Sequence, residues 1–178
     1  WIPACSTGEE AYSLAMVFHE VVAGSNPPAK YSLQIFATDL SADAIDRARQ
    51  GRFPPTISSD VSAERLERFF LQDKNDYLVR KEIRNMIIFA QQNIISDPPF
   101  TKLDILCCRN LLIYLNAKLQ QRLIPLFHYA LNRDGILLLG SADTPGHFSE
   151  LFAPLTTSSR MYRRLDNLAR QRLLTYFP

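Results

Sequence analysis

Apolar residues along this chain gather in short runs, and between the runs they recur at the spacing of one helical face. The runs of strand length are "SLQIFATD" (32–39), "NMIIFAQQ" (85–92), "LDILCC" (103–108) and "GILLLG" (135–140). Because hydrophobicity along them is nearly continuous, they predict strands buried on both faces, as in a mostly parallel sheet. The chain also begins inside an apparent strand, at Trp1.

Helical signals fill the intervals between these strands. The segment "LSADAIDRARQG" (40–51) predicts a helix that Ser41 caps and Gly51 ends. The segment "NAKLQQRLIPLFHYAL" (116–131) predicts another helix, which Asn116 can cap. The alternation of strands and helices predicts an α/β fold with a doubly wound, mostly parallel sheet.

Two stretches depart from simple alternation. Residues 51–84 hold a predicted short helix (62–70) and a predicted strand (76–83), which is more than a crossover needs, so we expect a small inserted subdomain. After the last apolar run we expect a helix and then antiparallel edge strands. The organisation predicted is one domain over 1–165, followed by a helical tail or linker over 166–178.

Composition narrows the class of protein. A chain of 178 residues with 47% hydrophobic and 21% charged residues predicts an ordinary globular domain, and a net charge of +2 gives no argument for nucleic acid. The apolar runs are far shorter than a membrane span of ~20 residues. Cys5, Cys107 and Cys108 fit neither a disulfide framework nor a zinc site, and the histidines show no metal-ligand spacing. We therefore expect buried reduced thiols, a cytoplasmic location and no metal.

Candidate chemistry lies where the strands end, because ligands of open α/β sheets bind at the carboxyl ends of the strands. The residues found there are "STGEE" (6–10), Asp39, Asn93, Arg109 and Asn110. Two acids, an amide and a single glycine make a poor anion site, since a pyrophosphate needs repeated glycines for close backbone approach. A cationic, hydroxyl-rich ligand suits this set better.

Asp39 ends the second strand, where an acid commonly binds two ribose hydroxyls. Such an acid is compatible with NAD and with adenosyl cofactors, and the missing phosphate loop favours S-adenosylmethionine, which has a ribose, a sulfonium cation and no phosphate. The alternative is that Asp39 is only a helix cap or part of a strand-end turn. The residues alone leave both open.

Four stretches together resemble the CheR family of chemotaxis methyltransferases: "CSTGEEAYSLAM", "FATDLSADAIDRARQGRF", "NMIIFAQQNI" and "LDILCCRNLLIYL". The resemblance runs from Trp1 to about Arg164. It implies a class I, Rossmann-like methyltransferase domain that transfers a methyl group from S-adenosylmethionine to glutamate side chains of chemoreceptors and leaves S-adenosylhomocysteine. It implies neither nucleic-acid binding nor direct membrane insertion.

The resemblance also assigns roles to residues. By it, cofactor binding falls to Glu9, Asp39, Asn93, Ile94, Cys108 and Arg109, and catalysis to Arg109 and Tyr114. Asp39 would bind the ribose, the pair at 93–94 would flank the adenine, and Tyr114 would stand near the transferring methyl. Alternatives stay open: Glu9 as a first-turn acid, Arg109 in a surface ion pair, and Tyr114 in the core.

Two departures from the family are visible. Family members carry a helical domain before this one, so we expect a fragment that lacks it. The tail "RRLDNLARQRLL" (163–174) suggests fusion to a further module, as in multidomain signalling proteins of the family. Ala142 and Asp143 stand where the family usually has "SE". Two rival functions remain: a regulatory module that binds S-adenosylmethionine without catalysis, and a methyltransferase of small molecules.

Overall fold

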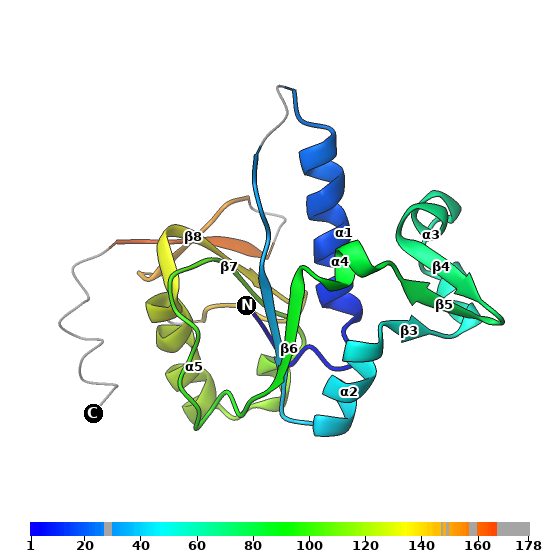
Figure 1. Cartoon of the computed structure of the whole chain (residues 1–178). Helices are drawn as coiled ribbons and strands as arrows, with labels where there is room; N and C mark the ends of the chain where they lie inside the picture. The colour runs from blue at the N-terminus through cyan, green and yellow to red at the C-terminus, as the bar shows by residue number, and fades with distance from the viewer. Residues whose placement is uncertain (27–29, 147, 149, 157–159, 167–178) are drawn as a thin grey trace. The chain divides into compact units, whose positions relative to one another are not determined.

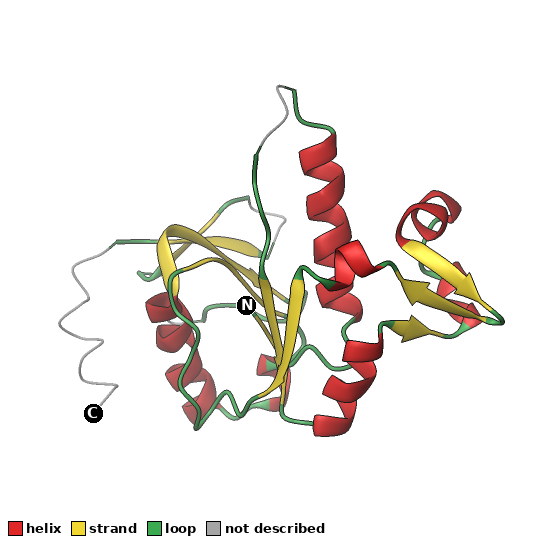
Figure 2. Cartoon of the chain, viewed as in Figure 1, coloured by secondary structure: helices red, strands yellow, loops and turns green. Residues whose placement is uncertain are grey.

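The structure, a computed structural model, describes residues 1–26, 30–146, 148, 150–156 and 160–166 (Figure 1). The chain divides into two compact units. One unit comprises Ile2 and Ala4–Gln92, and the other comprises Trp1, Pro3 and the chain from Asn93 onward. Both units combine strands with helices (Figure 2).

The first unit is built on parallel strands. A three-stranded sheet has the order β1-β2-β6, formed by β1 (Ile2–Pro3), β2 (Ile35–Asp39) and β6 (Ile87–Gln91). Strands β2 and β6 run parallel, with Ile35 opposite Ile87. Helix α1 (Glu9–Ala23) follows β1, and α2 (Ala42–Gln50) follows β2. Each predicted strand and helix of this unit is therefore present, with bounds a few residues shorter than expected.

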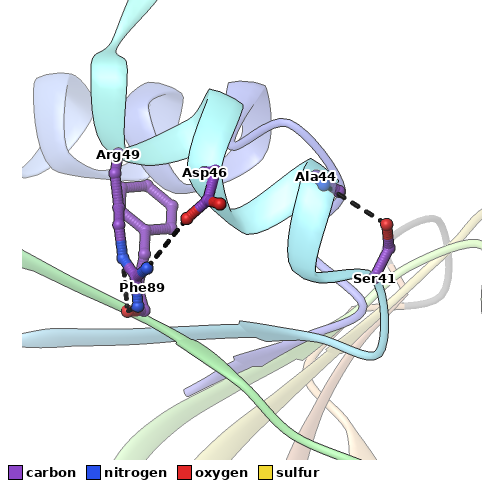
Figure 3. Close-up of polar contacts among 5 residues, drawn as sticks. All are labelled: Ser41, Ala44, Asp46, Arg49 and Phe89. Carbon is purple, nitrogen blue, oxygen red and sulfur yellow. Dashed lines mark hydrogen bonds and ion pairs between the residues drawn. The ribbon is translucent and has the colours of Figure 1, made fainter.

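Local chemistry fixes both ends of α2, as the sequence predicts. The Ser41 hydroxyl accepts the Ala44 amide at 3.3 Å, and Gly51 ends the helix with φ 60°, the left-handed conformation that glycine adopts readily (Figure 3). The guanidinium of Arg49 donates to the Phe89 carbonyl at 2.9 and 3.3 Å and pairs with Asp46 at 3.0 Å. Arg49 thereby ties α2 to strand β6.

Tyr12 of α1 organises the core of this unit. Its ring packs against Phe53 and Phe89 at centroid distances of 5.8 and 5.5 Å. Its buried hydroxyl donates to the Ala48 carbonyl of α2 at 2.7 Å, so the polar end of the ring is satisfied inside the core.

The predicted inserted subdomain is a separate antiparallel sheet (Figure 1). Its strands have the order β3-β5-β4. The subdomain contains these strands and three short helices, in the order β3 (Arg52–Phe53), η1 (Pro55–Ser59), α3 (Ala63–Phe69), β4 (Phe70–Asp73), β5 (Asp76–Val79) and α4 (Lys81–Arg84). The prediction of a strand over 76–83 is therefore wrong at its end, because β5 stops at Val79. Its pairing with β4 ends at Val79 opposite Phe70, and the following residues close a helical turn, with the Ile83 amide on the Arg80 carbonyl.

The second unit holds a four-stranded sheet with the order β7-β8-β10-β9. Strands β7 (Leu103–Cys108) and β8 (Leu131–Leu139) are parallel, whereas β10 (Met161–Arg164) runs antiparallel to both β8 and β9 (Phe152–Pro154). Between β7 and β8 lie η2 (Leu112–Tyr114) and α5 (Ala117–Ala130). The predicted cap of α5 is present, since the Asn116 side chain accepts the Leu119 amide at 3.0 Å. The antiparallel edge strands are confirmed as well.

The structure corrects two further expectations. No helix follows β8 among residues 141–146, which form turns and coil, and Gly146 has φ 59° after Pro145. Ile88 and Ile105 are 49% and 52% exposed, so the apolar runs do not mark strands that are buried on both faces throughout. The predicted tail helix lies, apart from Asp166, outside the described residues, and the boundary at 165 stays a prediction.

The fold class predicted from the sequence is confirmed: an α/β, Rossmann-like arrangement with parallel strands and an inserted antiparallel subdomain. Within the described ranges, no helix has the length and apolar character needed to cross a membrane.

Candidate cofactor site

The turn between β1 and α1 is conformationally strained. Ala4, Ser6 and Gly8 have φ values of 59°, 49° and 92°, a region that non-glycine residues rarely adopt. A Cβ added at Gly8 would lie 3.1 Å from both the Ala48 side chain and the Phe89 ring. The glycine is thus required by close packing and by its own backbone conformation. Strain of this kind is characteristic of binding sites.

Asp39 holds this turn in place. Its Oδ2 accepts the Ser6 amide at 2.9 Å, and its Oδ1 accepts the Ser41 amide at 2.9 Å. The strand-end turn considered as an alternative therefore exists. A carboxylate offers about four acceptor positions, so each oxygen can still accept one hydroxyl. The ribose role stays a prediction, and the geometry is compatible with it.

Glu9 is the first residue of α1, and its side chain is exposed. The Thr7 hydroxyl donates to its carboxylate, with distances of 2.6 Å to Oε1 and 2.8 Å to Oε2. This contact directs the carboxylate back towards the turn. An acid here is also favoured by the helix dipole, so the first-turn interpretation and the cofactor role are both consistent with the structure.

The electrostatics of the turn favour a cation. Burial raises the pKa of the Cys5 thiol to about 12, and the negative charges of Asp39, Glu10 and Glu9 act in the same direction. Burial penalises a charge of either sign, but the negative charges of these acids would repel a phosphate and attract a cation. A sulfonium cation with ribose hydroxyls fits both these charges and the acceptors of Asp39, so the residues present suit S-adenosylmethionine.

In the second unit, the site residues expected after β7 lie on its end and on the loop that follows. Cys108 is fully buried as the last residue of the strand, while Arg109 beside it is exposed. Asn110 has φ 57°, and its amide donates to Oδ2 of Asp143 at 3.2 Å. The roles of Cys108 and Arg109 stay predictions.

Asp143 is the residue whose structural role the sequence does not reveal. It is 4% exposed, and its own amide donates to the Gly140 carbonyl at 3.0 Å. A Cβ at Gly140 would lie 2.6 Å from Asp143 Oδ2 and 2.8 Å from Asn110 Oδ1, so only glycine fits between the two loops. The glycine three residues before the acid, at the end of an apolar strand, is the signal that could have suggested this contact.

Asn93 and Ile94 lie in a tight turn just after β6. The Asn93 amide donates to Asp97 at 2.8 Å, and the Asn93 side-chain oxygen accepts the Ile95 amide at 3.0 Å. Both Asn93 and Ile94 are half-buried. These two hydrogen bonds fix the turn, and contact with an adenine stays a prediction.

Tyr114 is 80% exposed at the end of η2, so the alternative that placed it in the core is wrong. Its neighbours Leu112 and Ile113 line a pocket of about 290 Å³, together with Asp143 and Phe148. Within the part of the chain that the structure describes, no cluster of side chains could ligate a metal ion.

The chain is similar in sequence to a known protein family and to several known proteins. Residues 1–161 match the family described as CheR methyltransferase, SAM binding domain. The chain is 41% identical over 167 residues to an uncharacterised 104.1 kDa protein of Rhodobacter capsulatus, a match that covers 93% of this chain and 17% of that protein.

Methyltransferases are among the other relatives. A putative methyltransferase, Cher3, of Pseudomonas putida is 32% identical over 178 residues, covering 92% of this chain and 62% of that protein. The chemotaxis protein methyltransferase of Escherichia coli is 29% identical over 161 residues, covering 85% and 54%. The chain thus spans little more than half the length of these two. The family match confirms the resemblance found in the sequence and, with it, S-adenosylmethionine as the cofactor.

Proposed function

The chain belongs to the CheR methyltransferase family, as its S-adenosylmethionine-binding domain, and from this membership we propose that it methylates glutamate side chains of chemoreceptors in the cytoplasm. Relatives named chemotaxis protein methyltransferases, such as that of Escherichia coli, support the substrate class.

The structural observation that supports the cofactor part of the proposal is the turn around Asp39, whereas methyl transfer rests on the family match. It offers hydroxyl acceptors beside acidic residues, lacks a phosphate-binding loop, and is fixed by two backbone hydrogen bonds to the Asp39 carboxylate. We assign binding of the ribose hydroxyls to Asp39. The negative charge of Glu9 would help to attract the positively charged end of the cofactor.

The proposed chemistry needs no general base. A glutamate side chain has a pKa of about 4.3 and is already ionised at neutral pH. S-adenosylmethionine, when bound, would supply an electrophilic methyl group for in-line transfer to the carboxylate oxygen, with the electron pair of the broken carbon–sulfur bond left on sulfur. The protein then has to orient the carboxylate and exclude water from it, which are the contributions of proximity and desolvation.

Arg109 and Tyr114 are the residues we assign to that task. Arg109 is exposed at the end of β7, where its guanidinium can orient a carboxylate through two parallel hydrogen bonds. Tyr114 presents an exposed phenol from η2, which we place beside the transferring methyl.

A transfer assay tests the proposal. The full-length protein, S-adenosylmethionine with a tritiated methyl group, and the cytoplasmic region of a chemoreceptor are incubated, and the receptor is then treated with base. Methyl esters of carboxylates release volatile tritiated methanol under these conditions, whereas methylated amines do not. Label that stays on the receptor would contradict carboxylate methylation, and binding of S-adenosylhomocysteine without transfer to any receptor would indicate the regulatory module instead.

A further inference from the structure

The loop from Arg109 to Asn116 connects β7 with α5 and carries both side chains that we assign to catalysis. Tyr114 lies within it, in the single turn η2. Because the Tyr114 ring is 80% exposed, packing of the ring does not orient it. Its direction depends on the backbone of η2, and a single 3-10 turn is a weak element by itself.

Gln120 of α5 supplies the missing support. Its side-chain nitrogen donates to the Leu112 carbonyl at 2.9 Å and to the Leu115 carbonyl at 3.0 Å. The Leu112 carbonyl also accepts the Leu115 amide at 3.0 Å, the bond that closes η2. Both donors of one half-buried amide are thus used on the carbonyls at the two ends of the turn that bears Tyr114.

The two carbonyls also determine the orientation of this amide. If the group were rotated by half a turn, its oxygen would face two carbonyl oxygens, and all three groups would be acceptors. The side chain is therefore a specific cross-link, which neither an apolar residue nor a carboxylate can replace.

The contact is not needed to begin the helix. Asn116 already caps α5 by accepting the Leu119 amide at 3.0 Å, and the Gln120 backbone amide donates to the Asn116 carbonyl at 3.1 Å. The next residue, Gln121, has the same side chain at the same end of α5 but is exposed. No hydrogen bond joins its side chain to the part of the chain that the structure describes.

We propose that Gln120 is a positioning residue, which holds η2 and through it the hydroxyl of Tyr114. Its effect on turnover rests on the proposed function, whereas its effect on η2 does not. The two effects are therefore measured separately, so that failure of one can be told from failure of the other.

Amide hydrogen exchange at Leu115 tests the effect on η2. Gln120→Leu removes both donors and should accelerate exchange at Leu115 about tenfold, since two hydrogen bonds are lost. Gln120→Glu places acceptors against the carbonyls and should accelerate exchange further. The matched controls, Gln121→Leu and Gln121→Glu, should leave it unchanged. Equal exchange in the Gln120 variants and the unmodified protein overturns the inference.

Turnover tests the positioning of Tyr114. Gln120→Leu should lower kcat for methyl transfer about tenfold and change the affinity for S-adenosylhomocysteine by less than about twofold. In a Tyr114→Phe background the same substitution should cost almost nothing further, because the hydroxyl it positions is gone. Additive losses overturn the inference. If the unmodified protein transfers no methyl groups, the proposed function fails, and exchange at Leu115 alone decides whether Gln120 holds η2.

Discussion

Replacing Asp39 by alanine should lower both the stability of the fold and the affinity for the cofactor, and the two effects can be measured separately. The carboxylate accepts two backbone amides, from Ser6 and Ser41, each at 2.9 Å. Hydrogen bonds to a charged group contribute about 1.5–3 kcal/mol each. Because Asp39 is only half-buried, water replaces part of each bond, and we expect a total loss of about 1.5–3 kcal/mol in the free energy of unfolding.

Cofactor binding adds two further hydrogen bonds to the same carboxylate, from the ribose hydroxyls. Their loss should cost about 1.5–3 kcal/mol of binding free energy, which corresponds to roughly a 10- to 150-fold weaker affinity for S-adenosylhomocysteine. The product is the better probe, because it tests the ribose contact without the sulfonium charge. Calorimetric titration at a temperature where Asp39→Ala is folded gives the affinity, and denaturant unfolding gives the stability.

A deoxyribose analogue of S-adenosylhomocysteine separates the ribose contact from distortion of the turn. The unmodified protein should prefer the ribose form, and Asp39→Ala should bind both forms equally. Asp43→Ala is the matched control, an exposed acid in the first turn of α2, and it should keep the preference. An undiminished preference for ribose in Asp39→Ala would refute the ribose role, and unchanged stability would refute the role in the turn.

Three further predictions address other parts of the molecule. Tyr114→Phe should lower single-turnover methyl transfer with little change in cofactor affinity, and normal turnover would remove the hydroxyl from the mechanism. Gly140→Ala places a Cβ 2.6 Å from a carboxylate oxygen of Asp143 and should lower the free energy of unfolding by about 1–3 kcal/mol in denaturant unfolding. In Gly24→Ala the nearest atom to the new Cβ is the Glu20 carbonyl oxygen at 3.3 Å, so the loss should be smaller. Equal losses in the two variants would contradict the packing around Gly140. Burial lowers the pKa of His128 below its ordinary value of 6.5, so the native state binds fewer protons than the unfolded state. The free energy of unfolding should therefore decrease as the pH is lowered from 6.5, by at most about 1.4 kcal/mol per pH unit. His128→Gln should reduce this slope, and an identical slope in the variant would exclude His128 as its source.

Features that depend on neighbours in sequence could be predicted. Ser41 and Asn116 cap their helices because a short polar side chain can reach an amide three residues ahead, and Gly51 ends α2 because glycine tolerates positive φ. The strand β7 has the bounds that its apolar run indicates. Asp39, Asn93 and Arg109 could be identified from their positions at or just after the ends of predicted strands, whereas the roles of Ile94 and Cys108 came only from the family resemblance.

Features that depend on contacts between distant segments could not be predicted in this way. Ser6 adopts positive φ, although nothing local favours it, while a carboxylate 33 residues away binds its amide. Asp143 is buried because it meets the amide of Asn110 from another loop. The end of β5 at Val79 is set by where its partner strand begins. In each case the partner, rather than the residue itself, decides the conformation.

Mass spectrometry of a chemoreceptor's cytoplasmic region, after incubation with the full-length protein and S-adenosylmethionine, tests the central claim most directly. We predict that particular receptor peptides gain the mass of one methylene group, that fragmentation places the gain on glutamate side chains, and that Asp39→Ala greatly slows its appearance. Methylation located on lysine or another side chain, or none in a protein that binds S-adenosylhomocysteine, would contradict the claim.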